Sequence, residues 1–357
     1  MFSKKTVRDV EVKDKVALVR TDYNLPLDGT GAITDDLRIR ASLPTIDYLL
    51  KNGAKKIILM SHLGRPEGKP DPKMSLRPVA ERLQELLPDT VVKFVSDTCG
   101  PDVEAAVRDL PMGGILLLEN LRFSADEEKN SEDYANEIVD STHADLFVQD
   151  GFAVVHRAHA SIEAITRLLP SVAGLLLEKE VRSLTAATTS PEHPLLVIIG
   201  GAKVDDKQSM IDLFLPIADQ IVVGGKIAAD GYTSDDPKVY VAEDFVSDEA
   251  GAKLDIGVVS TEKIVGMINE AKTIVWSGLL GKAEEAAFAT SSLAVAEAMG
   301  KCSAETIIGG GDTVGLVENL ERSRPDLSYT LISTGGGASL ELLSGKSLPG
   351  VDALEDK

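Results

Sequence analysis

Residues 195–207 read LLVIIGGAKVDDK, an apolar run followed by a glycine pair and by two lysines four positions apart. The apolar run predicts a buried strand, the glycines predict a tight turn, and the remainder predicts the start of a helix. Lys203 and Lys207 would then lie on one helix face. Two ammonium groups near the positive end of a helix dipole favour a bound anion between them, although an ordinary strand-to-helix turn with solvated lysines is the alternative.

Two later stretches repeat this pattern of a short β-rich run, a glycine cluster and a helix-like continuation. They are TIIGGGDT at residues 306–313 and LISTGGGA at residues 331–338. One glycine-rich turn is weak evidence. Three such turns at predicted strand ends suggest that glycines leave the backbone N–H groups accessible to one polyanionic ligand. A nucleoside triphosphate is the simplest candidate for that ligand.

Length and composition narrow the class of protein. A chain of 357 residues predicts two domains, and no uninterrupted apolar segment is long enough to span a bilayer. The first residues, MFSKKTVRDVEVKDK, lack the apolar core of a signal peptide, so we expect a cytoplasmic protein. Cys99 and Cys302 are far apart and indicate neither a disulfide framework nor a thiolate metal site. The net charge of −20 argues against partners such as nucleic acid or an anionic membrane.

Strand-like and helix-like segments alternate along the whole chain, which predicts α/β domains with mainly parallel sheets. A loop rich in Thr, Ser and Pro at residues 188–194 marks the expected domain boundary. The expected strands are residues 16–21, 56–60, 114–118, 145–149, 195–199, 220–223, 239–241 and 273–276. The expected helices are residues 42–52, 76–87, 131–141, 170–186, 262–272 and 284–299.

Polar clusters follow the strands of the first half, at residues 20–24, 61–66, 119–123 and 150–159. Ligands of an open parallel sheet bind at the carboxyl ends of its strands, so these clusters should line one side of the domain. Together with Arg38 they predict a basic basin, since arginine pairs bidentately with phosphate and carboxylate. Each arginine taken alone could instead be a surface ion-pair partner. The spacing of His156 and His159 gives only weak support for a metal site.

Ten stretches of the chain together resemble phosphoglycerate kinase, from about Val16 to Leu354. The resemblance implies two doubly wound parallel-sheet α/β domains joined by a hinge helix, with domain closure. It implies a phosphoglycerate-binding domain at residues 1–169, an interdomain helix and linker at 170–189, a nucleotide-binding domain at 190–340, and a C-terminal segment, 341–357, that returns to the first domain. The stretches are VRTDYNLPL, ITDDLRIRASLPTI, ILMSHLGRP, LLLENLRF, HRAHAS, AGLLLEKE, IIGGAKVDDK, IIGGGDT, STGGGASLELLSGK and LPGVDAL.

The resemblance also implies a reaction, 1,3-bisphosphoglycerate plus ADP to 3-phosphoglycerate plus ATP, with Mg²⁺, in a monomer. The attacking carboxylate is already ionised at pH 7, so no general base is needed. Arg38, Lys207 and Gly336 would be catalytic. The residues implied to hold 3-phosphoglycerate are Asp22, Asn24, Arg38, His62, Arg65, Arg122 and Arg157. Those implied to hold the nucleotide are Lys203, Lys207, Glu284, Gly311, Asp312, Thr313, Gly335, Gly336 and Gly337, with Asp312 as the Mg²⁺ ligand.

The sequence departs from the family pattern mainly in the second half. After Gly224 and Gly225 a helix-sized block is missing, and the family's Trp-Asn-Gly-Pro is replaced by residues 276–279, WSGL. We therefore expect a shortened nucleoside pocket, with Lys226 and Tyr232 on its wall. Two alternatives to an active enzyme remain: a weak or inactive paralogue that binds a phosphorylated acid, and a kinase with another phosphoryl donor.

Overall fold

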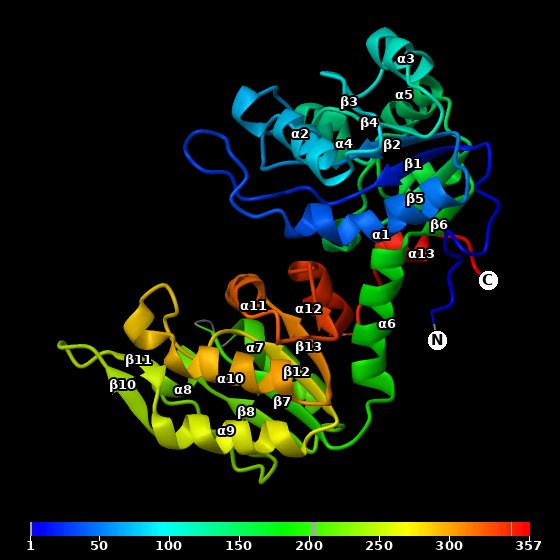
Figure 1. Ribbon diagram of the computed structural model, residues 1–357. Coiled ribbons are helices and arrows are strands. Elements are labelled where there is room, and N and C mark those ends of the chain that lie inside the picture. The colour runs from blue at the N-terminus through cyan, green and yellow to red at the C-terminus, as the bar shows by residue number, and fades with distance from the viewer. Residues whose placement is uncertain (1, 202–204, 344) are drawn as a thin grey trace. The chain divides into compact units, whose positions relative to one another are not determined.

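The computed structural model describes residues 2–201, 205–343 and 345–357. The chain divides into two compact units, which are best followed separately in Figure 1. The first unit comprises Met1–Lys179 and Ser347–Lys357, and the second comprises Glu180–Lys346. The helix α6 (Leu175–Thr189) contains the division point, so one continuous helix links the two units along the chain.

The first unit is built on a six-stranded parallel sheet in the order β3-β4-β2-β1-β5-β6. Its strands are β1 (Val16–Arg20), β2 (Lys56–Met60), β3 (Val92–Phe94), β4 (Gly114–Leu117), β5 (Leu146–Gln149) and β6 (Ser171–Ala173). Its helices are α1 (Leu37–Lys51), α2 (Arg77–Leu86), α3 (Pro101–Arg108), α4 (Ala125–Glu128), α5 (Glu132–Thr142) and α13 (Pro349–Asp352), with short 3₁₀ turns at Pro72–Met74, Leu121–Phe123, Phe152–Val154 and Ala164–Arg167.

The second unit has another six-stranded parallel sheet, in the order β14-β13-β12-β7-β8-β9. Its strands are β7 (Leu195–Ile199), β8 (Gln220–Val223), β9 (Val239–Val241), β12 (Thr273–Ser277), β13 (Glu305–Gly309) and β14 (Leu331–Ile332), with an antiparallel pair formed by β10 (Phe245–Ser247) and β11 (Lys253–Ile256). Its helices are α7 (Asp205–Phe214), α8 (Gly225–Ala229), α9 (Val258–Glu270), α10 (Thr290–Lys301), α11 (Gly311–Ser323) and α12 (Gly337–Leu343).

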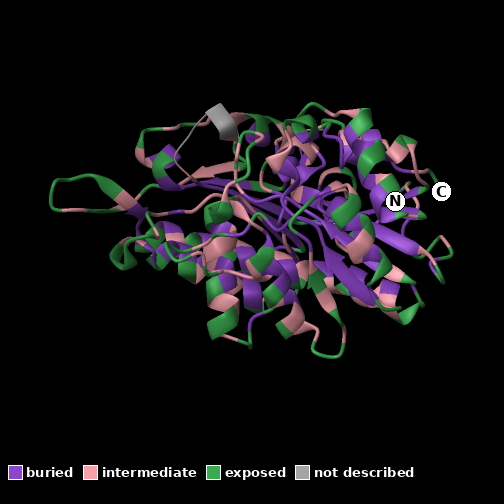
Figure 2. Cartoon of the chain, turned by 90° about the horizontal axis from the view of Figure 1, so that it is seen from above, coloured by how far each residue is buried: buried purple, intermediate pink, exposed green. Residues whose placement is uncertain are grey.

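The central strands are buried along their whole length, as the purple strands in Figure 2 show. Every residue of β1, β7 and β12 is buried, because helices cover both faces of a parallel sheet. This explains why these strands appear in the sequence as continuous apolar runs rather than as alternating patterns. The predicted fold class of two doubly wound parallel-sheet units is confirmed.

The strand order of each sheet reverses at its middle. In the first sheet the chain passes from β1 to β2 on one side and later adds β5 on the other side of β1. In the second sheet the chain passes from β7 to β8 and later adds β12 on the other side of β7. The loops that follow these central strands therefore diverge, which leaves room for a ligand at the carboxyl end of each sheet.

Several elements differ from the sequence expectation. The strand β3 and the helix α3 were not predicted, and neither was the antiparallel pair β10-β11. The predicted helix at residues 170–186 is wrong at its start, because β6 pairs with β5 before α6 begins at Leu175. The predicted helix at 284–299 is also wrong at its start. It begins at Thr290, after a 3₁₀ turn at Ala286–Phe288, although the preceding segment is rich in good helix formers.

The missing block is visible in the second unit. Only the five-residue helix α8 and a loop connect the parallel strands β8 and β9. The C-terminal segment belongs to the first unit, where Gly350 N donates to Val155 O at 2.9 Å and Glu355 N donates to Ser171 O at 3.0 Å. Across the residues that the structure describes, no helix combines the length and the apolar character needed to cross a bilayer.

Candidate functional site

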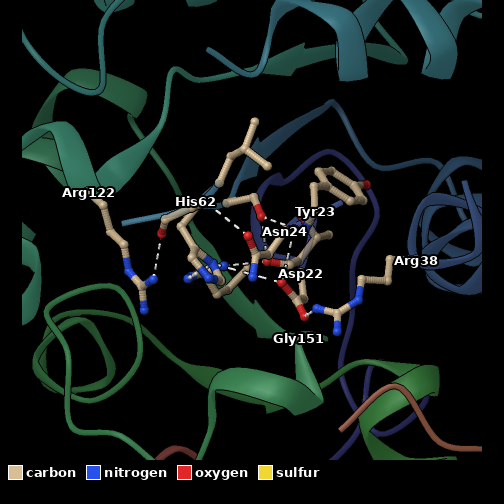
Figure 3. A network of polar contacts seen from close by, with 12 residues as sticks. Asp22, Tyr23, Asn24, Arg38, His62, Arg122 and Gly151 are labelled. Carbon is tan, nitrogen blue, oxygen red and sulfur yellow. Dashed lines mark hydrogen bonds and ion pairs between the residues drawn. The ribbon is translucent and has the colours of Figure 1, made fainter. Parts of the chain in front are cut away.

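Asp22 lies at the centre of a polar network at the carboxyl end of the first sheet (Figure 3). Its side chain is almost fully buried, and its carboxylate pairs with the guanidinium of Arg38, which enters from the first turn of α1. Asp22 Oδ1 also accepts a hydrogen bond of 3.1 Å from Asn24 N, and it lies 3.8 Å from His62 Nδ1. The loop after β1, the start of α1 and the loop after β2 are thereby held together.

Asn24 and Arg122 extend this network through Gly64. Asn24 Oδ1 accepts a hydrogen bond of 2.8 Å from Gly64 N, and Arg122 Nη1 donates one of 2.8 Å to Gly64 O. Arg122 is buried, and its Nε lies 3.2 Å from Glu128 Oε1. Burial lowers the pKa of Arg122, and repulsion from the nearby Arg157 contributes. Two of the predicted guanidinium groups, those of Arg122 and Arg157, therefore lie near enough to repel each other.

Arg157 and Arg65 are less tightly held than the rest of the predicted set. Arg157 is half-buried, and its Nε donates to His156 Nε2 at 3.1 Å. Arg65 is exposed and makes no side-chain hydrogen bond or ion pair within the described part of the chain. Asp22, Asn24, Arg38, His62 and Arg122 are thus in one contact network, whereas Arg65 is placed only by its position in the loop after His62.

Arg20 belongs to the site but was not among the predicted site residues. It is almost completely buried at the end of β1, where Nε donates to Ser161 Oγ at 2.8 Å and Nη2 lies 3.3 Å from His62 Nδ1. Burial and the positive charge of Arg20 lower the pKa of His62 well below its usual range. His62 is therefore neutral at pH 7 and acts in this network as a hydrogen-bonding group.

Glu127 is a further residue that sequence reasoning missed. Its carboxylate is fully buried, accepts hydrogen bonds from Ser161 N at 3.0 Å and from Ser161 Oγ at 2.6 Å, and compensates the charge of Arg20. The acidic run at residues 126–128 looks like an ordinary solvated helix start, so the sequence carried no signal that one of its carboxylates faces inward. Glu127 holds Ser161 in place, and Ser161 accepts a hydrogen bond from Arg20, so Glu127 helps to position the guanidinium of Arg20 in the network.

His159 gives the first unit a testable pH dependence. Burial together with Arg122 and Arg20 lowers its pKa to about 4, from the ordinary value of 6.5. The folded protein therefore binds this proton more weakly than the unfolded chain does. The contribution of neutral His159 to the free energy of unfolding is fully present above pH 6.5 and is lost as the pH falls towards 4. We expect the free energy of unfolding of the wild type, relative to His159→Gln, to fall by about 2 to 3 kcal/mol between pH 7 and pH 4.

Denaturant titrations of both proteins at several pH values measure this difference. The two stability curves should keep a constant separation between pH 7 and pH 8 and approach each other below pH 6.5. Curves that stay parallel down to pH 4 would contradict the assigned environment of His159.

In the second unit, the glycine turns after β7 and β12 pack directly against each other. Gly200 N donates to Ser277 O at 3.0 Å, and Gly201 N donates to Leu279 O at 2.8 Å. A Cβ atom at Gly278, whose φ is +97°, would lie 2.1 Å from Gly200 O. No side chain fits there, which is the physical reason for glycine at this position. The two turns form the floor of a backbone-lined site at the point where the strand order reverses.

Lys207, Ser277 and Thr313 surround this floor. Lys207 Nζ, from α7, donates to Ser277 Oγ at 2.8 Å, and Thr313 Oγ1 accepts a hydrogen bond of 2.9 Å from Gly278 N. Thr313 lies buried in the first turn of α11. The turn after β12 thus makes hydrogen bonds both to the glycine turn after β7 and to the start of α11, which follows the second predicted glycine turn. The predicted phosphate lysine Lys203 lies outside the described residues.

A cavity of about 500 Å³ opens above these turns. Asp312 and Glu284, the predicted metal and ribose ligands, both line it, and so does Gly311 at the start of α11. Of the two predicted replacements for the missing block, Lys226 lines this cavity and Tyr232 does not lie among its described lining residues. The remaining lining residues are Gly201, Lys207, Lys253, Leu254, Gly278, Leu279, Gly281, Lys282, Gly310 and Thr313.

The donor set at Asp312 fits a magnesium ion that is shared with phosphates. Asp312 is exposed in the first turn of an α-helix, and the described residues contain no group of three or more potential protein ligands. Mg²⁺ commonly binds one or two carboxylates and completes its octahedral shell with waters and phosphate oxygens. A cavity lined by two carboxylates, one of them at the start of α11, suits that pattern, whereas it does not suit a metal held by protein alone.

The third glycine cluster, Gly335–Gly337, follows β14 and leads into α12. Gly335 N donates to Ser333 Oγ at 3.2 Å, and the φ of +49° at Gly336 is in the left-handed region. Thr334, which precedes the cluster, is fixed by hydrogen bonds of 2.7 and 2.9 Å from its N and Oγ1 to the buried carboxylate of Glu180. None of these three glycines lines the cavity above Gly278, so the predicted phosphate cradle is placed at a separate strand end of the same sheet.

Comparisons with known proteins agree with this arrangement. A family model described as phosphoglycerate kinase matches residues 7–239 and 229–346. The chain is 44% identical over 404 aligned positions to a phosphoglycerate kinase of Chloroflexus aggregans, covering 99% of this chain and 100% of the relative. It is 42% identical over 401 positions to that of Moorella thermoacetica, covering 100% of each chain.

Two solved structures of phosphoglycerate kinases are similar over nearly the whole chain. The enzyme of Coxiella burnetii has a TM-score of 0.79 at 30% identity, and that of Pyrococcus horikoshii has a TM-score of 0.84 at 28% identity. Each covers 98% of both chains. The alignments with the sequence relatives exceed the 357 residues of this chain, so those relatives have positions that it lacks. The family model matches in two segments that overlap at residues 229–239, a few residues after Gly225, where the sequence predicts the missing block.

Proposed function

The chain belongs to the phosphoglycerate kinase family, and from that premise we propose how its two units carry out the family's reaction. The chain transfers a phosphoryl group between ATP and the carboxylate of 3-phosphoglycerate, in glycolysis and its reversal. Two features of one chain support the assignment best. The first sheet carries a basic network at the point where its strand order reverses, and the second sheet carries a cavity above glycine turns at the corresponding point.

3-Phosphoglycerate binds, in this proposal, to the network of the first unit. Arg122 and Arg157 supply two neighbouring guanidinium groups for its phosphate, which suits the bidentate geometry of arginine. Arg65 supplies a third from the adjacent loop. His62 is neutral and Asp22 pairs with Arg38, and both side chains suit hydrogen bonds to the substrate's hydroxyl group.

The nucleotide binds in the second unit with its phosphates over the floor formed by Gly201 and Gly278. Lys207 is close to this floor, and the N-terminus of α11 adds unpaired N–H groups and the positive end of a helix dipole. Asp312 would hold Mg²⁺, which neutralises phosphate charge when bound. Glu284, on the wall of the same cavity, would accept hydrogen bonds from the ribose.

The chemistry then requires alignment and charge stabilisation but no proton transfer. The carboxylate of the acid is already ionised and attacks the terminal phosphorus of ATP as the bond to the bridging oxygen breaks. Arg38 would stabilise the charge on the transferring group, and Lys207 would stabilise the leaving diphosphate. Backbone N–H groups around Gly336 would serve as a further cradle for the transferring group.

We further propose that the chain works as a cytoplasmic monomer without a nucleic acid or membrane partner. Its net charge of −20 supports the exclusion of polyanionic surfaces, and its phosphorylated substrates do not cross membranes unaided. Light scattering on the purified chain would test the monomer.

A coupled assay with MgATP and 3-phosphoglycerate tests the activity directly. Consumption of NADH through glyceraldehyde-3-phosphate dehydrogenase, dependent on both substrates, is the expected result. Binding of 3-phosphoglycerate without turnover, at any donor concentration, would support the inactive paralogue instead.

The shortened connection between β8 and β9 leads to a prediction about the nucleobase. The cavity offers only Leu254 and Leu279 as large apolar lining residues among those described, whereas a base is discriminated by shaped apolar and hydrogen-bonding contact. Contacts of this kind are worth about 1 to 3 kcal/mol, or a factor of roughly 10 to 200. We expect weak nucleotide binding, with dissociation constants for MgATP and MgGTP that differ by less than about tenfold.

Calorimetric titration of each nucleotide into the purified chain measures this. Micromolar binding of MgATP combined with strong rejection of MgGTP would mean that the remaining residues rebuild a selective adenine pocket.

A further inference from the structure

The cavity of the second unit is richer in cations than the phosphate end of a nucleotide requires. Lys207 lies beside the glycine floor, and three further lysines, Lys226, Lys253 and Lys282, line the same cavity. Only two carboxylates, Glu284 and Asp312, are among its described lining residues. Among the lining residues the lysines therefore outnumber the carboxylates, and cations gathered in a concave site favour an anionic ligand.

The three additional lysines come from three elements that are in contact. Lys226 lies on α8, which packs against β11, and Lys253 is the first residue of β11. Lys282 follows β12, and its backbone N donates to Leu254 O at 2.8 Å, so it is held beside the start of β11. The short helix α8 lies in the connection where the sequence predicts the missing block, so Lys226 comes from that connection and the other two lysines of this trio come from elements beside it.

The present partners of these lysines hold them only weakly. Lys226 Nζ lies 2.8 Å from Asp230 Oδ1 and Lys282 pairs with Glu285, in both cases between exposed side chains. Lys253 Nζ lies over the ring of Phe245, 4.4 Å from its centroid. Exposed ion pairs are worth about 0 to 1 kcal/mol, so these ammonium groups can turn to an incoming polyanion at little cost.

The charges around Lys282 keep it protonated. Its pair with Glu285 raises its pKa, and the more distant Glu284 and Asp248 act in the same direction. These carboxylates also mean that a single small anion gains little at Lys282. A ligand that extends from Lys207 to the trio, and so meets several cations at once, gains from all of them together.

We propose that this cavity binds linear inorganic polyphosphate, with one end at Lys207 and the start of α11 and with the rest of the chain along Lys226, Lys253 and Lys282. The proposal rests on the assignment of the cavity as the nucleotide site and extends it to a base-free ligand. The lysines that line the cavity offer several cations to repeating phosphates, whereas Leu254 and Leu279 are its only described large apolar lining residues. Further apolar residues, Leu293, Leu316 and Leu320, line an adjoining cavity. Polyphosphate and MgATP should therefore compete.

Calorimetric titration of tripolyphosphate and of a chain of about ten phosphates, alone and against bound MgATP, tests the proposal on the full-length chain. The variants are Lys253→Met combined with Lys282→Met, and, as a matched control, Lys301→Met, an exposed lysine of the same unit that pairs with Glu297. We expect competition with MgATP, tighter binding of the longer chain, and a loss of at least tenfold in its affinity in the double variant.

The control should bind polyphosphate like the wild type, and the double variant should lose more affinity for the ten-phosphate chain than for MgATP. Its thermal unfolding midpoint checks that the fold is intact. Unchanged polyphosphate affinity in the double variant, or binding that does not compete with MgATP, would overturn the proposal. Failure of the coupled assay would instead refute the proposed function, and it would leave the binding result to stand on its own.

Discussion

Replacement of Arg38 by alanine is expected to lower kcat by roughly 100- to 1,000-fold and to change the KM for 3-phosphoglycerate by less than about fivefold. Arg38 enters the basin from the first turn of α1 and is about one-third exposed, so its guanidinium is accessible to a ligand while it pairs with Asp22. A cation directed at the transferring phosphoryl group interacts chiefly with the charge of the transition state, and its removal therefore affects turnover more than binding.

Two further variants separate charge from structure. Arg38→Lys keeps the cation but loses the planar fork, so it should recover only part of the activity. Arg40→Ala removes a neighbouring guanidinium of the same helix that pairs with Asp36 on the exposed face, and it should behave like the wild type. A rise in KM with unchanged kcat in Arg38→Ala would assign Arg38 to substrate binding alone.

The central strands were predictable because burial on both faces of a parallel sheet leaves a plain signal. Residues 16–19, 195–199 and 274–276 of these strands are apolar, and each run is followed by a polar residue or glycine. Edge elements left no such signal. The strand β3 has three residues, none of them buried, so it is too short to show a long apolar run. Its place in the sheet depends on pairing with β4, which is a tertiary contact.

The ligand-facing residues were more predictable than the residues that support them. Asp22 and His62 lie in clusters at strand ends, where the geometry of a parallel sheet gathers them, and Arg38 joins them from the first turn of α1. Glu127 lies in an acidic run far along the chain, and only the folded structure brings its carboxylate to Ser161 and Arg20. A residue that holds another side chain in place is recognised only by its contacts in the folded protein. The local sequence pattern around Glu127 does not show contacts with residues so far away in the chain.

The sequence indicated the short connection between β8 and β9, but it did not indicate which lysines line the neighbouring cavity. A short connection after Gly225 was visible as a gap against the family pattern, and α8 has five residues as a result. The sequence did not show that Lys253 and Lys282 would line the same cavity. Backbone pairing in the folded unit brings β11 and the loop after β12 together. The charge of the nucleotide site is therefore a property of the folded unit.

Replacement of Asp312 by asparagine is expected to raise the Mg²⁺ concentration needed for half-maximal activity by at least about tenfold and to lower activity at 1 mM Mg²⁺ by roughly 100-fold. A hard divalent cation prefers a charged oxygen ligand, and Asp312 is the carboxylate in the first turn of α11 beside the glycine floor. Asparagine keeps the shape of the side chain and removes the charge, so the variant isolates the electrostatic contribution.

The same carboxylate also favours the start of α11 through the helix dipole, an effect worth about 0.3 to 1 kcal/mol. Thermal unfolding of Asp312→Asn without nucleotide measures this small structural cost separately. Asp326→Asn, which changes an exposed carboxylate of the same unit paired with Arg324, is the matched control and should leave the Mg²⁺ titration unchanged. If Asp312→Asn gives the wild-type Mg²⁺ titration, the ion is held by other groups and Asp312 does not belong to the site. If the titration shifts while the affinity for free tripolyphosphate stays the same, the carboxylate acts through the cation. The phosphates would then be bound by other groups, which we propose to be Lys207 and the backbone of the glycine turns.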